Sequence, residues 1–188
     1  MHITIISATN RPGSNTRKVA GYIQNFLKEN LPKTDAVDIL DLQDLPPEIF
    51  SPKSYDEKPK SFEKFANLVL KTDGLLCVVP EYNGGFPGVF KYFIDMLPFP
   101  ASLQKKPAAF VGVAMGKFGA LRAVEQMQAI WGYRHAHLFT EKVLIPAVDK
   151  AIDADGKPLD PVVLKLLHSE VNNFVEFARK LMNVAPSV

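Results

Sequence analysis

The chain has 188 residues, a length typical of one domain with its own hydrophobic core, and we expect residues 1–188 to form a single domain. Its composition is 47% hydrophobic and 22% charged, which excludes a disordered chain, a fibrous repeat and a coiled coil. The 22 basic and 20 acidic residues give a net charge of +2, so the average charge does not indicate a partner made of nucleic acid or an anionic membrane.

A single cysteine, Cys77, excludes an intramolecular disulfide and a cysteine-rich metal site. The apolar run at the start of the chain meets Asn10 and Arg11 too early for a signal peptide. No other segment approaches the ~18 apolar residues that span a bilayer. We therefore expect a soluble, cytoplasmic protein that binds neither membranes nor nucleic acid.

Fifteen prolines, a fraction above the usual ~5%, fall between periodic segments and mark the boundaries of the expected elements. Short apolar runs predict strands, and apolar residues at every third or fourth position predict helices. In chain order these elements are a strand at 2–7, a helix after Ser14, a strand at 36–42, a helix around 62–70, a strand at 74–80, a helix from Pro87 to Leu97, a strand at 108–115, a helix from Ala120 to about Trp131, a strand at 137–146 and a helix from Val162 to Met182. Most of the strands are almost continuously apolar, as in strands buried on both faces, and the alternation predicts an α/β fold with a parallel sheet.

A parallel sheet of this kind binds ligands outside the carboxyl ends of its strands. The loops expected at this edge follow the first, third and fourth strands and read SATNRPGSNT, PEYNGGFPG and MGKFGA. These three loops are the candidate site.

The first loop has the composition of an anion site. Residues 1–28 contain no Asp or Glu, although the amides at a helix start carry a partial positive charge that an acidic residue commonly offsets. Ser14 can cap the helix, but Arg17 stands where a capping box has Glu or Gln. One interpretation is that Ser14 merely caps and the arginines are solvated; the other is that the helix start is open to a phosphate. The candidate phosphate ligands are Arg11, Ser14, Asn15 and Thr16.

The second and third loops combine glycines with aromatic and polar side chains. Asn83 follows Tyr82 and precedes a glycine pair, and backbone groups beside glycine can approach a flat ligand closely. In the third loop Gly116 and Gly119 flank Lys117 and Phe118. A tight strand-to-helix turn without a ligand explains either loop equally well.

The first loop and the segment PEYNGGFPGVFKYFIDML at 80–97 resemble the phosphate loop and the flavin loop of the NADPH-dependent FMN reductases. This family also includes quinone, azo-dye and chromate reductases, and the resemblance covers the chain from the first strand to the last helix. It implies a flavodoxin-like three-layer sandwich with a five-stranded parallel sheet in the order 2-1-3-4-5 and helices on both faces. The chain departs from the common family pattern at Ser7, Thr9 and Gly85.

The resemblance implies that the chemistry takes place on bound FMN, with no catalytic side chain and no metal. The residues that it implies hold FMN are Thr9, Arg11, Ser14, Asn15, Thr16, Pro80, Glu81, Tyr82, Asn83, Gly84, Gly116, Lys117, Phe118 and Gly119. It implies an oxidoreductase in which a hydride passes from NAD(P)H through FMN to a quinone, an azo compound or free flavin by a ping-pong mechanism. NADPH or NADH would be a transient co-substrate, and Lys117 and Arg122 either meet a ribose phosphate or are solvated.

The resemblance also implies a homodimer or homotetramer, formed in part by the helix that carries Phe86, Phe90 and Phe93. A helix buried in the core needs the same aromatic residues, so both possibilities stay open. The alternative function is a flavodoxin-type electron carrier or an FMN-binding module without NAD(P)H chemistry. Such carriers are usually strongly acidic, whereas this chain has a pI of about 8.6, which favours the enzyme.

Other reactive residues have simpler interpretations. We expect Cys77 to be a small core residue, and His135 and His137 to lie at the surface because no third metal ligand is near them in the sequence. Segment 151–162 lacks the end ligands of a calcium loop and predicts a polar turn. We expect Glu81 to serve the structure of its loop rather than to donate a proton.

Overall fold

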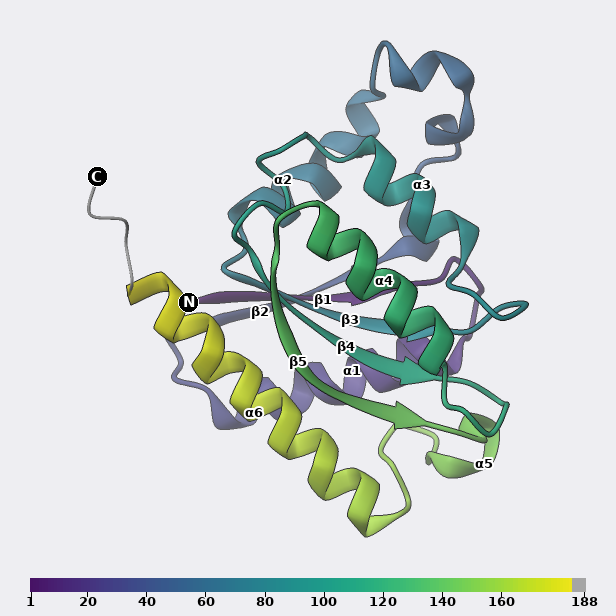
Figure 1. Ribbon diagram of the computed structural model, residues 1–188, viewed down its shortest axis with the longest axis vertical. Coiled ribbons are helices and arrows are strands. Elements are labelled where there is room, and N and C mark those ends of the chain that lie inside the picture. Colours follow the sequence, from purple (N-terminus) through teal and green to yellow (C-terminus); the bar gives the residue numbers. More distant parts are fainter. Residues whose placement is uncertain (184–188) are drawn as a thin grey trace.

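Parallel strands form the central sheet of the computed structural model, which describes residues 1–183 (Figure 1). The strands are β1 (His2–Ser7), β2 (Ala36–Asp41), β3 (Gly74–Pro80), β4 (Pro107–Val113) and β5 (His137–Ile145). Their order is β2-β1-β3-β4-β5 and every pairing is parallel. The predicted sheet and its order are therefore confirmed.

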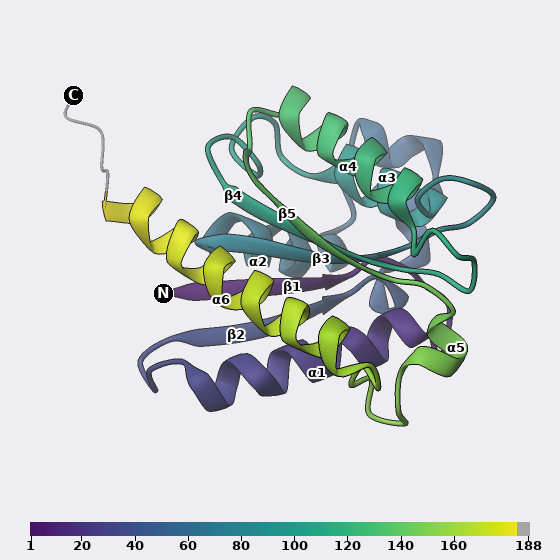
Figure 2. The same ribbon diagram turned by 60° about the horizontal axis from the view of Figure 1, so that its bottom comes forward.

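Helices cover both faces of the sheet, as Figure 2 shows. One face carries α1 (Asn15–Asn30) and α6 (Pro161–Asn183). The opposite face carries α2 (Glu63–Lys71), α3 (Gly88–Met96) and α4 (Leu121–Tyr133). A short helix, α5 (Val148–Ala151), follows β5. Within residues 1–183 no helix combines the length and apolar character of a membrane span.

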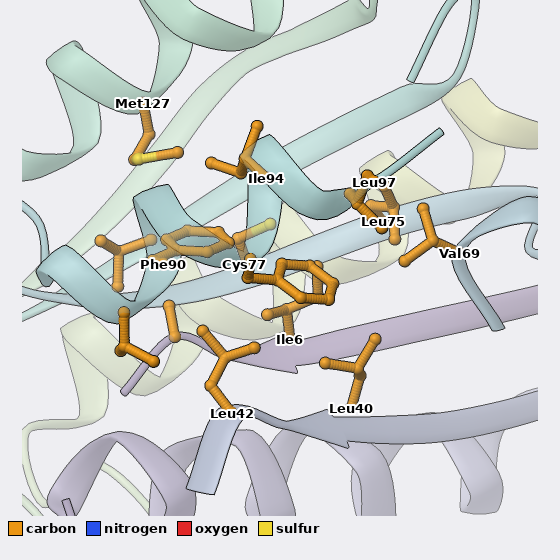
Figure 3. Close-up of a cluster of buried hydrophobic side chains, with 14 of the residues drawn as sticks. Ile6, Leu40, Leu42, Val69, Leu75, Cys77, Phe90, Ile94, Leu97 and Met127 are labelled. Atoms are coloured by element: carbon orange, nitrogen blue, oxygen red, sulfur yellow. The ribbon is translucent and has the colours of Figure 1, made fainter. Parts of the chain in front are cut away.

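The core consists of two apolar layers, one on each side of the sheet. All residues of β3 and β4 are buried, which explains their continuous apolar sequences. On the side of α2–α4, Trp131 contacts Phe90 and Phe110 with ring centroids 5.4 and 5.6 Å apart. Cys77 lies in this layer with no exposed surface, as predicted (Figure 3). Phe90 and Phe93 are also fully buried, so these two aromatics serve the core of this chain.

The boundaries and connections differ from the sequence expectations in detail. The third helix begins at Gly88, because Pro87 has extended backbone angles and stands at the cap position. The second strand ends at Asp41, whose side chain accepts a hydrogen bond from the Gln43 amide and starts a 3-10 turn. Four short 3-10 turns fill the segment between β2 and α2, where no element was predicted for residues 43–61: η1 (Leu42–Asp44), η2 (Pro47–Phe50), η3 (Pro52–Tyr55) and η4 (Lys60–Phe62).

Candidate functional site

A cavity of about 410 Å³ opens at the carboxyl ends of β1, β3 and β4. Its walls come from the three loops that follow these strands and from the start of α5. The lining residues are Arg11, Pro12, Gly13, Ser14, Asn15, Thr16, Pro80, Glu81, Tyr82, Asn83, Gly84, Val113, Ala114, Met115, Gly116, Phe118, Gly119, Ala120 and Val148. Of the predicted site residues, all but Thr9 and Lys117 line this cavity, so the three loops do meet in one place.

One end of the cavity is the start of α1, which has no acidic residue in its first turn. Ser14 caps this helix, with its hydroxyl oxygen accepting a hydrogen bond from the Arg17 amide at 3.1 Å. That bond leaves the hydroxyl hydrogen of Ser14 free to donate. The Arg17 side chain pairs with Asp41 at 3.0 Å, whereas Arg11 is exposed and forms no salt bridge within the described part of the chain.

The loop after β3 is a tight turn whose backbone faces the cavity. Tyr82 and Gly85 exchange two backbone hydrogen bonds of 2.8 and 3.0 Å. Asn83 and Gly84 between them have φ values of 52° and 78°, in the left-handed region that asparagine and glycine tolerate best. A Cβ atom added at Gly84 would meet no protein atom within 4 Å. Packing within the protein therefore does not require the glycine, and the open backbone is accessible to a ligand.

Thr9 joins the first loop to the second from behind the cavity wall. Its hydroxyl forms a 2.8 Å hydrogen bond with the Tyr82 hydroxyl and accepts a bond from the Arg11 amide at 3.2 Å. Thr9 is fully buried and does not line the cavity. Its position suits a residue that orients Tyr82 and Arg11.

Residues of α4 hold the loop after β3 from the other side. Arg122 reaches Oε1 of Glu81 at 3.5 Å, and Gln126, one turn further along α4, reaches the Gly84 carbonyl at 3.5 Å. The other carboxylate oxygen of Glu81 is buried and has no hydrogen-bond partner among the described residues. Glu81 thus has the structural contact expected of it. Gln126 was not predicted, because nothing in its local sequence indicates its contact with a loop about 40 residues earlier.

Val148 was not predicted to line the cavity, and Met115 lies in the candidate loop 115–120 but was not among the predicted site residues. The Val148 amide donates to the Ala114 carbonyl at 3.0 Å, which fixes the start of α5 against the loop after β4. The available signal was position alone, since Val148 comes three residues after the end of the fifth strand.

The remaining reactive residues lie outside the cavity. Burial raises the pKa of the Cys77 thiol, which keeps it protonated and inert. His135 and His137 are exposed, as expected. Segment 151–162 contains the predicted polar turn, with the Asp153 carboxylate accepting from the amides of Asp155 and Lys157.

Comparisons with known proteins agree on one family. Residues 1–150 match the family described as NADPH-dependent FMN reductase. A quinone reductase from Pseudomonas putida is 33% identical over 131 residues, which are 66% of this chain and 67% of that protein. An NADPH azoreductase from a Bacillus species is 26% identical over 184 residues, 96% of this chain and 98% of that protein. The solved structure of FerB, a flavoenzyme NAD(P)H:(acceptor) oxidoreductase from Paracoccus denitrificans, superposes with a TM-score of 0.77 at 23% identity, over 95% of this chain and 97% of that one.

Proposed function

The chain belongs to the NADPH-dependent FMN reductase family and is an FMN-dependent oxidoreductase with NAD(P)H as electron donor, and from this premise we propose that it binds FMN in the cavity and reduces small acceptors. The proposed acceptors are a quinone, an azo compound or free flavin, since similar proteins include a quinone reductase and an azoreductase. The observation that carries this proposal is the single cavity that joins an anion-binding helix start to two glycine-containing loops.

The first loop fits the phosphate of FMN. The start of α1 offers unpaired amides, Ser14 and Thr16 line the cavity with hydroxyl groups, and Arg11 supplies a charge that the described residues do not neutralise. A dianionic phosphate takes charge-assisted hydrogen bonds from such donors, and these are stronger than neutral ones. Asn15, at the first helical position, completes the proposed set.

The other two loops fit the flavin ring. The turn from Pro80 to Gly84 presents backbone amides and carbonyls, which match the alternating donors and acceptors on the polar edge of a flavin. A Cβ atom at Gly116 would also meet no protein atom within 4 Å, so this loop leaves room for a flat ring. We propose that Tyr82, Phe118 and Gly119 line the ring and that Thr9 and Lys117 act from outside the wall.

FMN supplies hydride transfer, so the protein needs to bind, orient and shield rather than to provide an acid or a base. The cavity is open at its mouth, beside the exposed side chains of Met115 and Phe118. We propose a ping-pong order in which the oxidised nicotinamide leaves before the acceptor enters the same mouth. An electron carrier without NAD(P)H chemistry is disfavoured by the basic pI of about 8.6.

A homodimer or homotetramer and a cytoplasmic location are also part of the proposal. An aromatic patch beside the ends of α3 and α4 supports self-association, with Phe99 70% and Tyr133 78% exposed. The lone cysteine supports a reducing compartment. Light scattering of the purified protein measures the mass directly, and a monomer at all concentrations would remove the oligomer from the proposal.

The decisive experiment mixes the FMN-loaded protein with NADPH or NADH in the absence of oxygen. The flavin absorbance should bleach, and addition of benzoquinone should restore it. A protein that keeps its FMN but is not bleached by either nicotinamide is a carrier or binding module. A protein that takes up no FMN would overturn both functions.

Replacing Arg11 tests the phosphate end separately. Arg11→Ala should weaken FMN binding about tenfold, because one charge-assisted contact is lost, while thermal stability without FMN stays unchanged. Lys18→Ala is the matched control. Lys18 lies on α1, just after the loop that carries Arg11; it is an exposed positive charge and does not line the cavity. Equal FMN affinity in Arg11→Ala and Lys18→Ala, measured by fluorescence titration, would exclude Arg11 from the site.

A further inference from the structure

Two cationic side chains lie over an exposed aromatic ring at the mouth of the cavity. The Lys117 ammonium and the Arg122 guanidinium each lie 5.1 Å from the centre of the Phe118 ring. Phe118 is 48% exposed and lines the cavity, so its ring is accessible to a bound molecule. These three residues are called the mouth cluster below.

The mouth cluster carries uncompensated positive charge. Glu81 contacts Arg122 at 3.5 Å, and Lys117 forms no salt bridge with any residue in the described range 1–183. Two cations against one carboxylate leave a net charge of about +1 at the mouth. The contact with Glu81 also limits the conformations of Arg122, which lowers the entropy lost when it binds an anion.

The phosphate of FMN does not account for this charge, because the proposed function assigns that phosphate to Arg11 and the start of α1, in the first loop. Quinones and azo compounds carry no obligatory negative charge at neutral pH. A free flavin nucleotide also brings phosphate, but it is only one of the three proposed acceptors. The nicotinamide donor brings further phosphates to the mouth whichever acceptor is used. An aromatic ring beside cations fits an adenine base with a phosphate next to it.

We propose, resting on the proposed function, that Lys117, Phe118 and Arg122 bind the adenosine end of the donor and select NADPH over NADH. Adenine stacks on Phe118, and the two cations contact the 2′-phosphate. NADPH and NADH differ only in this phosphate, so differential binding must come from groups that contact it. The mouth cluster supplies such cationic groups: it lies beside the cavity and outside the first loop, which is assigned to the phosphate of FMN.

The test measures binding of NADP⁺ and NAD⁺ to the FMN-loaded protein by titration calorimetry. Wild-type protein should bind NADP⁺ more tightly, and Lys117→Gln and Arg122→Gln should each weaken NADP⁺ binding about tenfold while NAD⁺ binding changes less than about twofold. Arg122→Lys should restore most of the NADP⁺ affinity. The effect should shrink as salt is raised, because the cluster is exposed.

Lys64→Gln is the matched control, because Lys64 lies over the Phe65 ring at 4.9 Å on α2 and does not line the cavity. Binding of adenosine 2′,5′-bisphosphate and of adenosine 5′-monophosphate tests whether the effect arises at the adenosine end of the donor, because only the bisphosphate carries the 2′-phosphate. The variants should lose affinity for the bisphosphate and keep their affinity for the monophosphate. Arg122 also contacts the loop after β3, so the FMN content of each variant is measured. If Arg122→Gln has lost FMN, the test is decided by Lys117→Gln alone.

Equal losses for NADP⁺ and NAD⁺, or equal wild-type affinities for both, would overturn the selection of NADPH by the mouth cluster. These outcomes differ from failure of the proposed function, in which neither NADPH nor NADH bleaches the flavin. Steady-state kinetics add a second measurement, because the KM for NADPH should rise more in the variants than the KM for NADH.

Discussion

Glu170→Gln should remove part of the pH dependence of the protein's stability. Glu170 lies on the face of α6 that packs on β5, and only 2% of it is exposed. One carboxylate oxygen accepts a 2.7 Å hydrogen bond from the Val143 amide on β5, and the other is buried with no partner in the described range. Burial, and secondarily the negative charge of Glu141, raise the pKa of Glu170 well above its usual value, although the Val143 amide opposes the shift.

The size of the effect follows from proton linkage. Below the usual carboxyl pKa of ~4.3, the folded and unfolded chains both hold the proton, and the favourable contribution of Glu170 is fully present. Above it, the unfolded chain releases the proton while the folded chain retains it, so the free energy of unfolding falls by up to about 1.4 kcal/mol per pH unit. The fall stops once the pH exceeds the raised pKa of the folded state. Glutamine keeps the acceptor for Val143 but cannot ionise, so the fall attributable to this residue disappears.

Urea denaturation at pH 5, 6, 7 and 8 with a fixed FMN concentration measures this difference. The stability of Glu170→Gln relative to wild type should increase as the pH rises from 5, by no more than about 1.4 kcal/mol per pH unit, until the pH passes the raised pKa of the folded state. Unpaired amide hydrogens of glutamine cost about 1–3 kcal/mol at every pH, which shifts the curve but not its slope. Glu176→Gln, at an exposed position of the same helix, should follow the wild-type slope. Parallel curves for wild type and Glu170→Gln would refute the reasoning.

Three further substitutions test the supports of the site and the fold. Gly112→Ala should lower the free energy of unfolding by about 2 kcal/mol, or the Tm by about 6 °C, and weaken FMN binding, because the added methyl group overlaps the Gly119 carbonyl oxygen. An unchanged Tm would contradict this. Thr9→Val should lower FMN affinity about fivefold, because Tyr82 loses its hydrogen bond to Thr9. The double variant Thr9→Val/Tyr82→Phe should bind FMN about as tightly as Thr9→Val in the same fluorescence titration. Lys106→Met should cost about 2–3 kcal/mol in urea denaturation, because the Lys106 ammonium donates to three backbone carbonyls at the end of α2, at 2.7, 3.2 and 2.7 Å; a loss below about 0.5 kcal/mol would show that solvent replaces it.

The sheet could be predicted because its sequence signals are local and strong. A strand covered on both faces must be apolar along its whole length, and 74–80 and the run beginning near 108 have that character. Residues 43–61 gave no such signal, because the short 3-10 turns between β2 and α2 are held by local hydrogen bonds and by a few apolar residues such as Leu42 and Ile49 beneath α3. A chain with prolines every few residues has no period to detect.

The lining of the site could be predicted more fully than its supports. The carboxyl ends of parallel strands meet at one edge, so the loops themselves were identifiable. The bond between Thr9 and Tyr82 joins residues 73 positions apart, and no spacing rule connects such a pair. Glu170 was more accessible to prediction, since it stands three residues after Leu167 and four before Phe174, on the apolar face of its helix.

The distribution of the cavity walls along the chain also has a consequence for biosynthesis. The walls come from four separate segments, beginning at Arg11 and finishing at Val148. A ribosome-bound chain that has exposed the first three strands already contains the phosphate loop but lacks the loop after β4 and the start of α5. Capture of the cofactor must therefore wait until about four fifths of the protein has emerged, and FMN then stabilises a nearly complete domain by mass action instead of guiding its early folding.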